Sequence, residues 1–174
     1  MLHRIVVAPS ACTETMRVQR VAPMVYCFCV LGSDATHWGY AAERDTQLMT
    51  GRALARAIND ICIEDDSPII EVIVKNTGVE KYFKEFIPVW IAEDRLTQKH
   101  GGSEWKEVHL VKAITDARIR KPLDRDERRA LRIVTSIARD NVRQIAESAF
   151  ANDPTLYSRC GTILTDEHSG APKF

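Results

Sequence analysis

The chain has 174 residues, and its 24 Lys and Arg residues balance its 24 Asp and Glu residues, so the formal net charge is zero. This length suffices for one domain with a substantial core, and a neutral chain has no overall attraction to nucleic acid or to a membrane surface. No apolar run approaches the ~20 residues of a membrane-spanning helix, and the apolar stretch near the N-terminus is too short for a secretory signal.

In chain order, the first half of the sequence predicts three strands, a helix and a fourth strand. Short apolar and β-branched runs indicate the strands, and Gly32-Ser33-Asp34 between the second and the third is typical of a hairpin turn. In residues 46–62, apolar side chains recur at helical spacing, which predicts an amphipathic helix. The predicted strands are residues 3–8, 24–31, 36–44 and 69–74.

The second half of the chain is predicted to be mainly helical. Pro88 is expected to end the first of these helices, because proline lacks the N–H that a helix interior needs. Asp124 and Glu127 form a capping-box pattern, which marks the start of the longest helix. The predicted elements are helices at 79–87 and 89–97, a helix after Ser103, a weak strand at 116–122 and a helix from Asp124 to about Phe150.

Three leading antiparallel strands followed by alternating strands and helices predict an α/β fold, with a mixed five-stranded sheet flanked by helices. Residues 1–150 are expected to form this domain, and residues 151–174 a C-terminal tail. Within the tail, the segment "TLYSRCGTIL" would either add a strand to an exposed sheet edge or fray.

The order of elements over residues 3–150 resembles the ribonuclease H-like superfamily, with the type 1 ribonuclease H fold. "IVVAPSAC" stands where the family's first strand ends in Asp-Gly-Ser, and "HWGYAAERDTQLMTGRALARAI" looks like its third strand running into a helix that begins with Glu-Leu. "VIVKNTGV" resembles the fourth strand with its Thr-Asp-Ser ending, and "ESAFANDPT" is similar to the end of the last helix. The family's four acidic positions then correspond to Ala8, Gln47, Asn76 and Gln144 or its neighbour Arg143.

None of these four positions carries a carboxylate. The active sites of such nucleases resemble two-metal sites, in which ions ~3.5–4 Å apart stabilise the attacking and leaving oxygens. Mg²⁺ in such a site prefers anionic oxygen ligands. The resemblance with these departures therefore implies that the domain is catalytically inactive, is not an enzyme, and has no metal and no cofactor. Its implied role is that of a protein-binding adaptor or scaffold in a larger assembly. An unrelated α/β fold, in which Asn76 simply begins a helix, is the alternative.

A second signal lies in the last predicted helix, where six arginines fall on one face at ~100° per residue. Arg side chains bind phosphate and carboxylate groups bidentately, so the row predicts a contact surface for a phosphate backbone or an acidic partner. The alternative is a solvated helix face. The neutral net charge favours a protein partner, with nucleic acid as the other possibility and no membrane contact. The six residues are Arg125, Arg128, Arg129, Arg132, Arg139 and Arg143.

The remaining ionisable residues leave one enzymatic alternative open. A shifted site built from Asp34, Glu43, Asp45 or Asp140 would make the chain a metal-dependent nuclease. The five histidines lack the spacing of metal ligands. Five cysteines without a CxxC pair indicate reduced thiols and an intracellular, cytoplasmic location.

Overall fold

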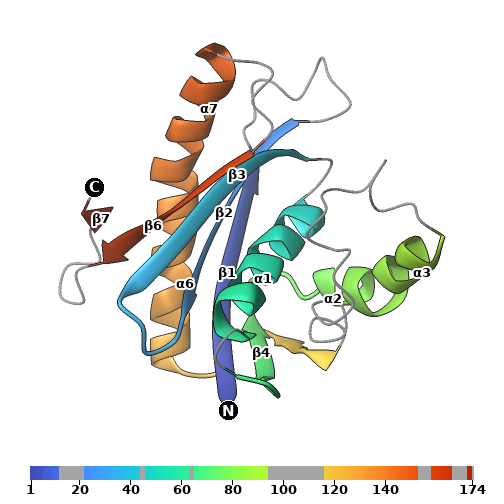
Figure 1. Ribbon diagram of the computed structural model, residues 1–174. Helices are drawn as coiled ribbons and strands as arrows, with labels where there is room; N and C mark the ends of the chain where they lie inside the picture. Colours follow the sequence, from blue (N-terminus) through green and yellow to red (C-terminus); the bar gives the residue numbers. More distant parts are fainter. Residues whose placement is uncertain are drawn as a thin grey trace.

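A mixed sheet forms the centre of the molecule, with its strands in the order β5-β4-β1-β2-β3-β6-β7 (Figure 1). The computed structural model describes residues 1–11, 22–43, 46–62, 65–93, 116–152, 158–165 and 172–173. The strands are β1 (Leu2–Ala11), β2 (Ala22–Val30), β3 (Ala35–Glu43), β4 (Ile69–Ile73), β5 (Arg118–Arg120), β6 (Ser158–Thr165) and β7 (Pro172–Lys173). The helical elements are α1 (Thr46–Cys62), α2 (Val79–Lys81), η2 (Tyr82–Phe86), α3 (Ile87–Ala92), α6 (Arg125–Ile137), η4 (Ala138–Val142) and α7 (Arg143–Asn152).

The first five strands confirm the predicted mixed sheet. β1, β2 and β3 pair antiparallel, with Val7 opposite Phe28 and Tyr26 opposite Gly39. β4 pairs parallel with β1, and β5 pairs parallel with β4. A parallel neighbour requires a crossover connection, and α1 lies in the connection between the β1–β3 meander and β4.

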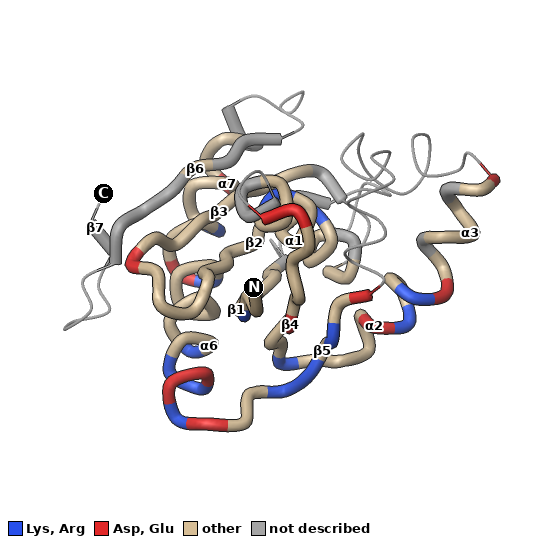
Figure 2. The backbone as a smooth tube through the Cα atoms, turned by 60° about the horizontal axis from the view of Figure 1, so that its bottom comes forward, with Lys and Arg blue, Asp and Glu red and all other residues tan. Residues whose placement is uncertain are grey.

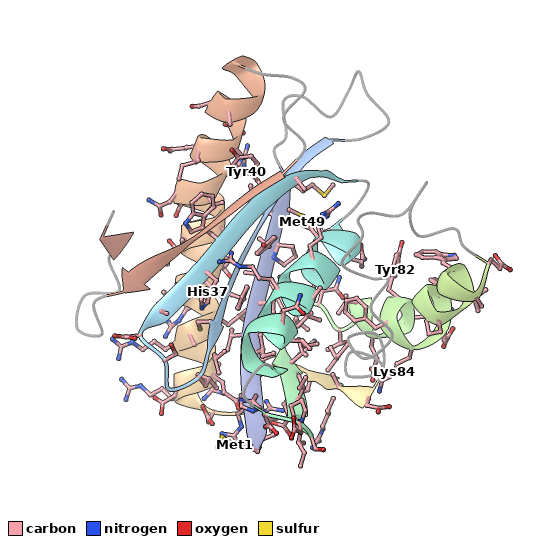
Figure 3. All side chains as sticks on the ribbon, viewed as in Figure 1. Met1, His37, Tyr40, Met49, Tyr82 and Lys84 are labelled. Atoms are coloured by element: carbon pink, nitrogen blue, oxygen red, sulfur yellow. The ribbon has the colours of Figure 1, made fainter. Side chains whose placement is uncertain are left out.

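Helices cover both faces of the sheet, and two buried clusters fill the two interfaces. Successive strand residues point to opposite faces, so Ile5 of β1 packs with the cluster under α1, while Val6 packs with the cluster under α6. Met49 of α1 is fully buried between the helix and the sheet (Figure 3). Among the described residues, no helix combines the length and the apolar character that a membrane crossing requires.

The long C-terminal helix, built from α6, η4 and α7, confirms the predicted span and its start signal. The Asp124 side chain accepts a hydrogen bond from the Glu127 N–H at 2.8 Å. The Glu127 carboxylate does not complete the capping box, because it accepts from the Leu123 N–H at 2.8 Å instead. η4 is a single π-helical turn within an otherwise continuous helix.

The prediction that a helix ends at Pro88 is wrong. α3 begins at Ile87 and continues through Pro88, after the π-helical turn η2. Pro88 lies just after the π-helical turn, where the i→i−4 hydrogen-bond pattern of the helix is already interrupted, so its missing N–H costs less than it would within a regular α-helix. The expected end of the bent helix, at residues 94–97, and the helix after Ser103 lie outside the described residues.

Of the two alternatives for the tail, the structure shows strand addition. β6 pairs antiparallel with the outer edge of β3, with Trp38 opposite Gly161. The Arg56 guanidinium of α1 holds the two strands together, because its Nη1 donates to the Trp38 carbonyl at 2.7 Å and to the Gly161 carbonyl at 3.1 Å. Residues 158–165 are therefore part of the sheet, and they cover an edge that would otherwise be open to pairing with other chains.

Candidate functional site

Three of the four positions that the family resemblance singled out lie around one cavity of about 180 Å³. Ala8 comes from β1, Gln47 from the first turn of α1, and Asn76 from the segment after β4. They meet because β1 and β4 are parallel neighbours, and the carboxyl ends of such strands lie at one edge of the sheet. The other lining residues are Val7, Pro9, Thr46, Thr50, Val74, Lys75, Val79, Leu131 and Thr135.

The fourth position, Gln144, has an exposed side chain in α7 and is not among the described residues that line the cavity. α6 starts beside the amino end of β1, where Arg4 Nε lies 3.9 Å from Glu127 Oε1. From Arg4 to Ala8 the strand rises roughly 13 Å, and a helix covers this distance in about nine residues. The helix therefore passes Ala8 near Thr135, and Gln144 lies more than two turns beyond the cavity.

The polar groups of the cavity are mostly neutral amides and hydroxyls. The Asn76 Oδ1 accepts a hydrogen bond from the Gly78 N–H at 2.9 Å, a turn that leads into α2. This contact explains why an amide can follow β4: Asn76 starts the turn that leads into the helix, which is the role that the alternative interpretation gave it. The Thr50 hydroxyl donates to the Thr46 carbonyl at 2.9 Å, and the Thr46 hydroxyl donates to Gln47 Oε1 at 3.4 Å.

These side chains do not fit the metal pair that the family resemblance implies. Among the described residues that line the cavity, Lys75 alone is charged, and the charge is positive. Ala8 and Leu131 offer no oxygen, and neutral amide carbonyls attract divalent ions far less than carboxylates do. In the part of the chain that the structure describes, no three His, Cys, Asp or Glu side chains lie close enough together to hold a metal ion.

A larger groove of about 640 Å³ adjoins this cavity and shares Lys75, Leu131 and Thr135 with it. Figure 2 shows Lys and Arg segments on β5 and along α6, the helix that forms the wall of the groove. The lining residues are Lys75, Pro122, Arg125, Arg128, Leu131, Arg132, Thr135, Ser136 and Arg139. Four of the six arginines singled out by the sequence thus come together, joined by a lysine from the end of β4 that the sequence reasoning missed.

The two other arginines of the predicted row lie outside the groove. Arg143 Nε donates to Glu147 Oε1 at 2.9 Å within α7. Arg129 is not among the residues that line the groove, although it follows Arg125 by four residues. The groove arginines follow each other at intervals of three, four and seven residues, which is the spacing of a single helix face.

The charge of the groove is only partly neutralised. Asp140 accepts a hydrogen bond from Arg139 Nε at 2.8 Å, and this contact raises the pKa of Arg139 and lowers that of Asp140. Within the described part of the chain, Lys75, Arg125 and Arg132 form no ion pair with an acidic side chain. The groove therefore carries several positive charges, and none of the described residues that line it is acidic.

The acidic residues considered for a shifted nuclease site do not gather at either hollow. Asp34 is exposed in the turn between β2 and β3, and Asp140 is exposed beside Arg139. Neither belongs to the lining of the cavity or of the groove. The side chains of Glu43 and Asp45 lie outside the described residues.

No protein-family model and no curated protein sequence matches this chain. Among solved structures, LC9-RNase H1, a type 1 RNase H with the type 2 active-site motif, is similar at 13% identity and a TM-score of 0.49, over 79% of this chain and 72% of that one. The foamy viral protease-reverse transcriptase in complex with an RNA/DNA hybrid is similar at 12% identity and a TM-score of 0.48, over 78% of this chain and 19% of that one. LC11-RNase H1, isolated from compost, is similar at 14% identity and a TM-score of 0.43, over 80% of this chain and 97% of that one.

These comparisons correct one prediction. The expectation that the chain is not an enzyme is contradicted, because the solved structures that it resembles are of ribonucleases H and of a reverse transcriptase. The fold itself follows from the strands: β1 to β5 have the expected order and directions, with helices on both faces. The chain has a ribonuclease H-like fold.

Proposed function

We propose that this domain binds nucleic acid, with the phosphodiester backbone lying in the groove along α6. The observation that carries the proposal is the groove itself, which is lined by one lysine and four arginines and by no acidic residue among those described. Guanidinium groups bind phosphate oxygens bidentately, and neutralised phosphates release counterions, which supplies most of the affinity of sequence-independent binding.

The length of the arginine row suits a polymer with regularly spaced charges. From Arg125 to Arg139 the helix rises roughly 21 Å at 1.5 Å per residue. One strand of a duplex carries a phosphate every ~3.4 Å along its axis, so the row faces about six nucleotides. The protein partner expected from the neutral net charge stays a prediction, and an acidic protein segment would compete for the same arginines.

Fluorescence anisotropy with labelled oligonucleotides tests this function. A single strand, a DNA duplex and an RNA–DNA hybrid are each titrated at salt concentrations from 50 to 200 mM. Over this range a protein that contacts 6–10 phosphates loses affinity by a factor of about 10³–10⁵. EDTA is present throughout, so that metal-dependent cleavage of a probe is not mistaken for weak binding. We expect affinity to fall steeply with salt for at least one of these ligands.

Matched variants locate the binding surface. Arg128→Ala and Arg132→Ala are each expected to weaken binding and to reduce the salt slope by about one. Arg129→Ala removes the same charge from the same helix outside the groove and serves as the control. Affinity that does not depend on salt, or an Arg129→Ala variant that loses as much as Arg128→Ala, would contradict binding in the groove.

A further inference from the structure

The cavity beside the groove has a different chemistry from the groove, although the two share part of their walls. Five cations are among the described residues that line the groove, whereas those that line the cavity are apolar side chains, amides and hydroxyls, with one lysine at the junction. We propose that the cavity binds one unpaired nucleobase of the strand whose phosphates lie in the groove. This inference rests on the proposed function, and it specifies the ligand as a nucleic acid with an unpaired base.

The size of the cavity suits a single aromatic ring. An engineered protein cavity of about 150 Å³ with apolar walls binds benzene, and the cavity here measures about 180 Å³. Much of its wall can contact the flat face of a ring, because it is made of buried or half-buried aliphatic side chains. These are Val7, Ala8, Pro9, Val74, Val79 and Leu131.

The polar groups of the cavity suit the edge of a base rather than a phosphate. A side-chain amide has both a donor and an acceptor, as the edges of bases do, and Gln47 and Asn76 enter the cavity from two different elements. The Asn76 oxygen already accepts from the Gly78 N–H, which leaves its NH₂ group to donate to a base carbonyl. Among the described lining residues a phosphate would find only Lys75 as a charged partner here, so the phosphates belong in the groove.

The position of Lys75 connects the two hollows. It follows β4, its side chain is exposed, and it is part of the lining of both the cavity and the groove. A nucleotide bound with its base in the cavity would therefore have its own phosphate next to the Lys75 ammonium group. The base must be unpaired beforehand, since extruding a paired base from a duplex costs a few kcal/mol.

The test changes the ligand, so it does not depend on how a variant folds. Three duplexes of one sequence are titrated in EDTA: one fully paired, one with a single unpaired thymine, and one with an abasic unit at the same position. All three offer closely matched phosphates, but only the second offers a free base. We expect the unpaired thymine to increase affinity about tenfold over the abasic unit, the size of one well-made base contact.

A variant then assigns the gain to the cavity. Gln47→Leu keeps the approximate volume of the side chain and removes its amide, so the ratio of thymine to abasic affinity should fall towards one. Equal, salt-dependent affinity of the wild-type protein for the thymine and abasic duplexes would overturn the base site while leaving the groove in place. Absence of binding to all three duplexes would overturn the base site, and the groove would be overturned with it if the single strand and the RNA–DNA hybrid also fail to bind.

Discussion

The ion pair between Glu127 and Arg120 makes the sharpest prediction about stability. The Glu127 side chain is only 2% exposed, and its carboxylate accepts hydrogen bonds from Arg120 Nη1 and Nη2, both at 2.7 Å. Arg120, which is 10% exposed, also donates from Nη2 to Glu71 Oε2 at 2.7 Å. These contacts join the start of α6 to β5 and to β4, so Glu127→Ala removes the centre of a buried network.

The expected loss follows from the geometry of this network. Removing one partner of a buried ion pair costs about 3–5 kcal/mol, because it leaves an uncompensated charge. Arg120 keeps Glu71 as a partner, so the loss for Glu127→Ala should lie near the lower end, about 3 kcal/mol. For a chain of this size, 1 kcal/mol corresponds to about 2–4 °C in Tm, so Tm should fall by roughly 6–12 °C.

Urea unfolding followed by circular dichroism measures this loss. Glu85→Ala is the matched control, because Glu85 is 61% exposed and its carboxylate lies 3.9 Å from Lys81 Nζ on the surface. Exposed pairs of this kind contribute little to stability, so the control should unfold almost as the wild type does. A loss below about 1 kcal/mol for Glu127→Ala, or equal losses in both variants, would refute the reasoning.

Two further predictions concern pH and the added strand. Hydrogen bonds from Arg120 and from the Leu123 N–H lower the pKa of Glu127 from 4.5 to about 2. The contribution of this carboxylate to stability is therefore complete above its unfolded-state pKa and is lost as the pH falls towards 2. Over this pH range the wild type should lose more stability than Glu127→Gln does, and parallel curves of stability against pH would contradict this. A Cβ at Gly161 would lie 2.5 Å from the Trp38 ring, so Gly161→Ala should cost about 1–3 kcal/mol through overpacking and speed amide hydrogen exchange in β6, whereas unchanged exchange would argue against the close packing of β6 on β3.

The arrangement of the sheet could be predicted because the information is local. Short apolar and β-branched runs marked β1 to β4, and the order of elements determined which strands end at the same edge. The resemblance to the ribonuclease H-like superfamily implied that Ala8, Gln47 and Asn76 share one site, and all three line one cavity. Gln47 lies at the start of α1, Asn76 follows β4, and Ala8 lies in β1 just beyond the residues that pair with β4.

The register of the last helix against the sheet could not be predicted in the same way. A helix pattern shows which residues share a face. It does not show which of them lies next to a given strand residue, because this depends on where the connection from β5 places the first turn of the helix. The contact of Glu127 with Arg4 and Arg120 sets that position, and it brings Leu131 and Thr135 to the cavity in place of Gln144. The buried Glu127 was read from the sequence only as a helix cap.

The same network explains how α6 can begin with arginines at all. The first turn of a helix carries a partial positive charge, so cations there are unfavourable, yet Arg125 and Arg128 occupy this region and line the groove. Asp124 caps the helix, and the Glu127–Arg120 pair fastens its first turn to the sheet. A phosphate in the groove would meet both the guanidinium groups and the positive end of the helix. The arginines thus stand where they oppose helix formation but favour an anionic ligand, while Asp124, Asp126 and Glu127 place negative charge at the same end of the helix and stabilise it.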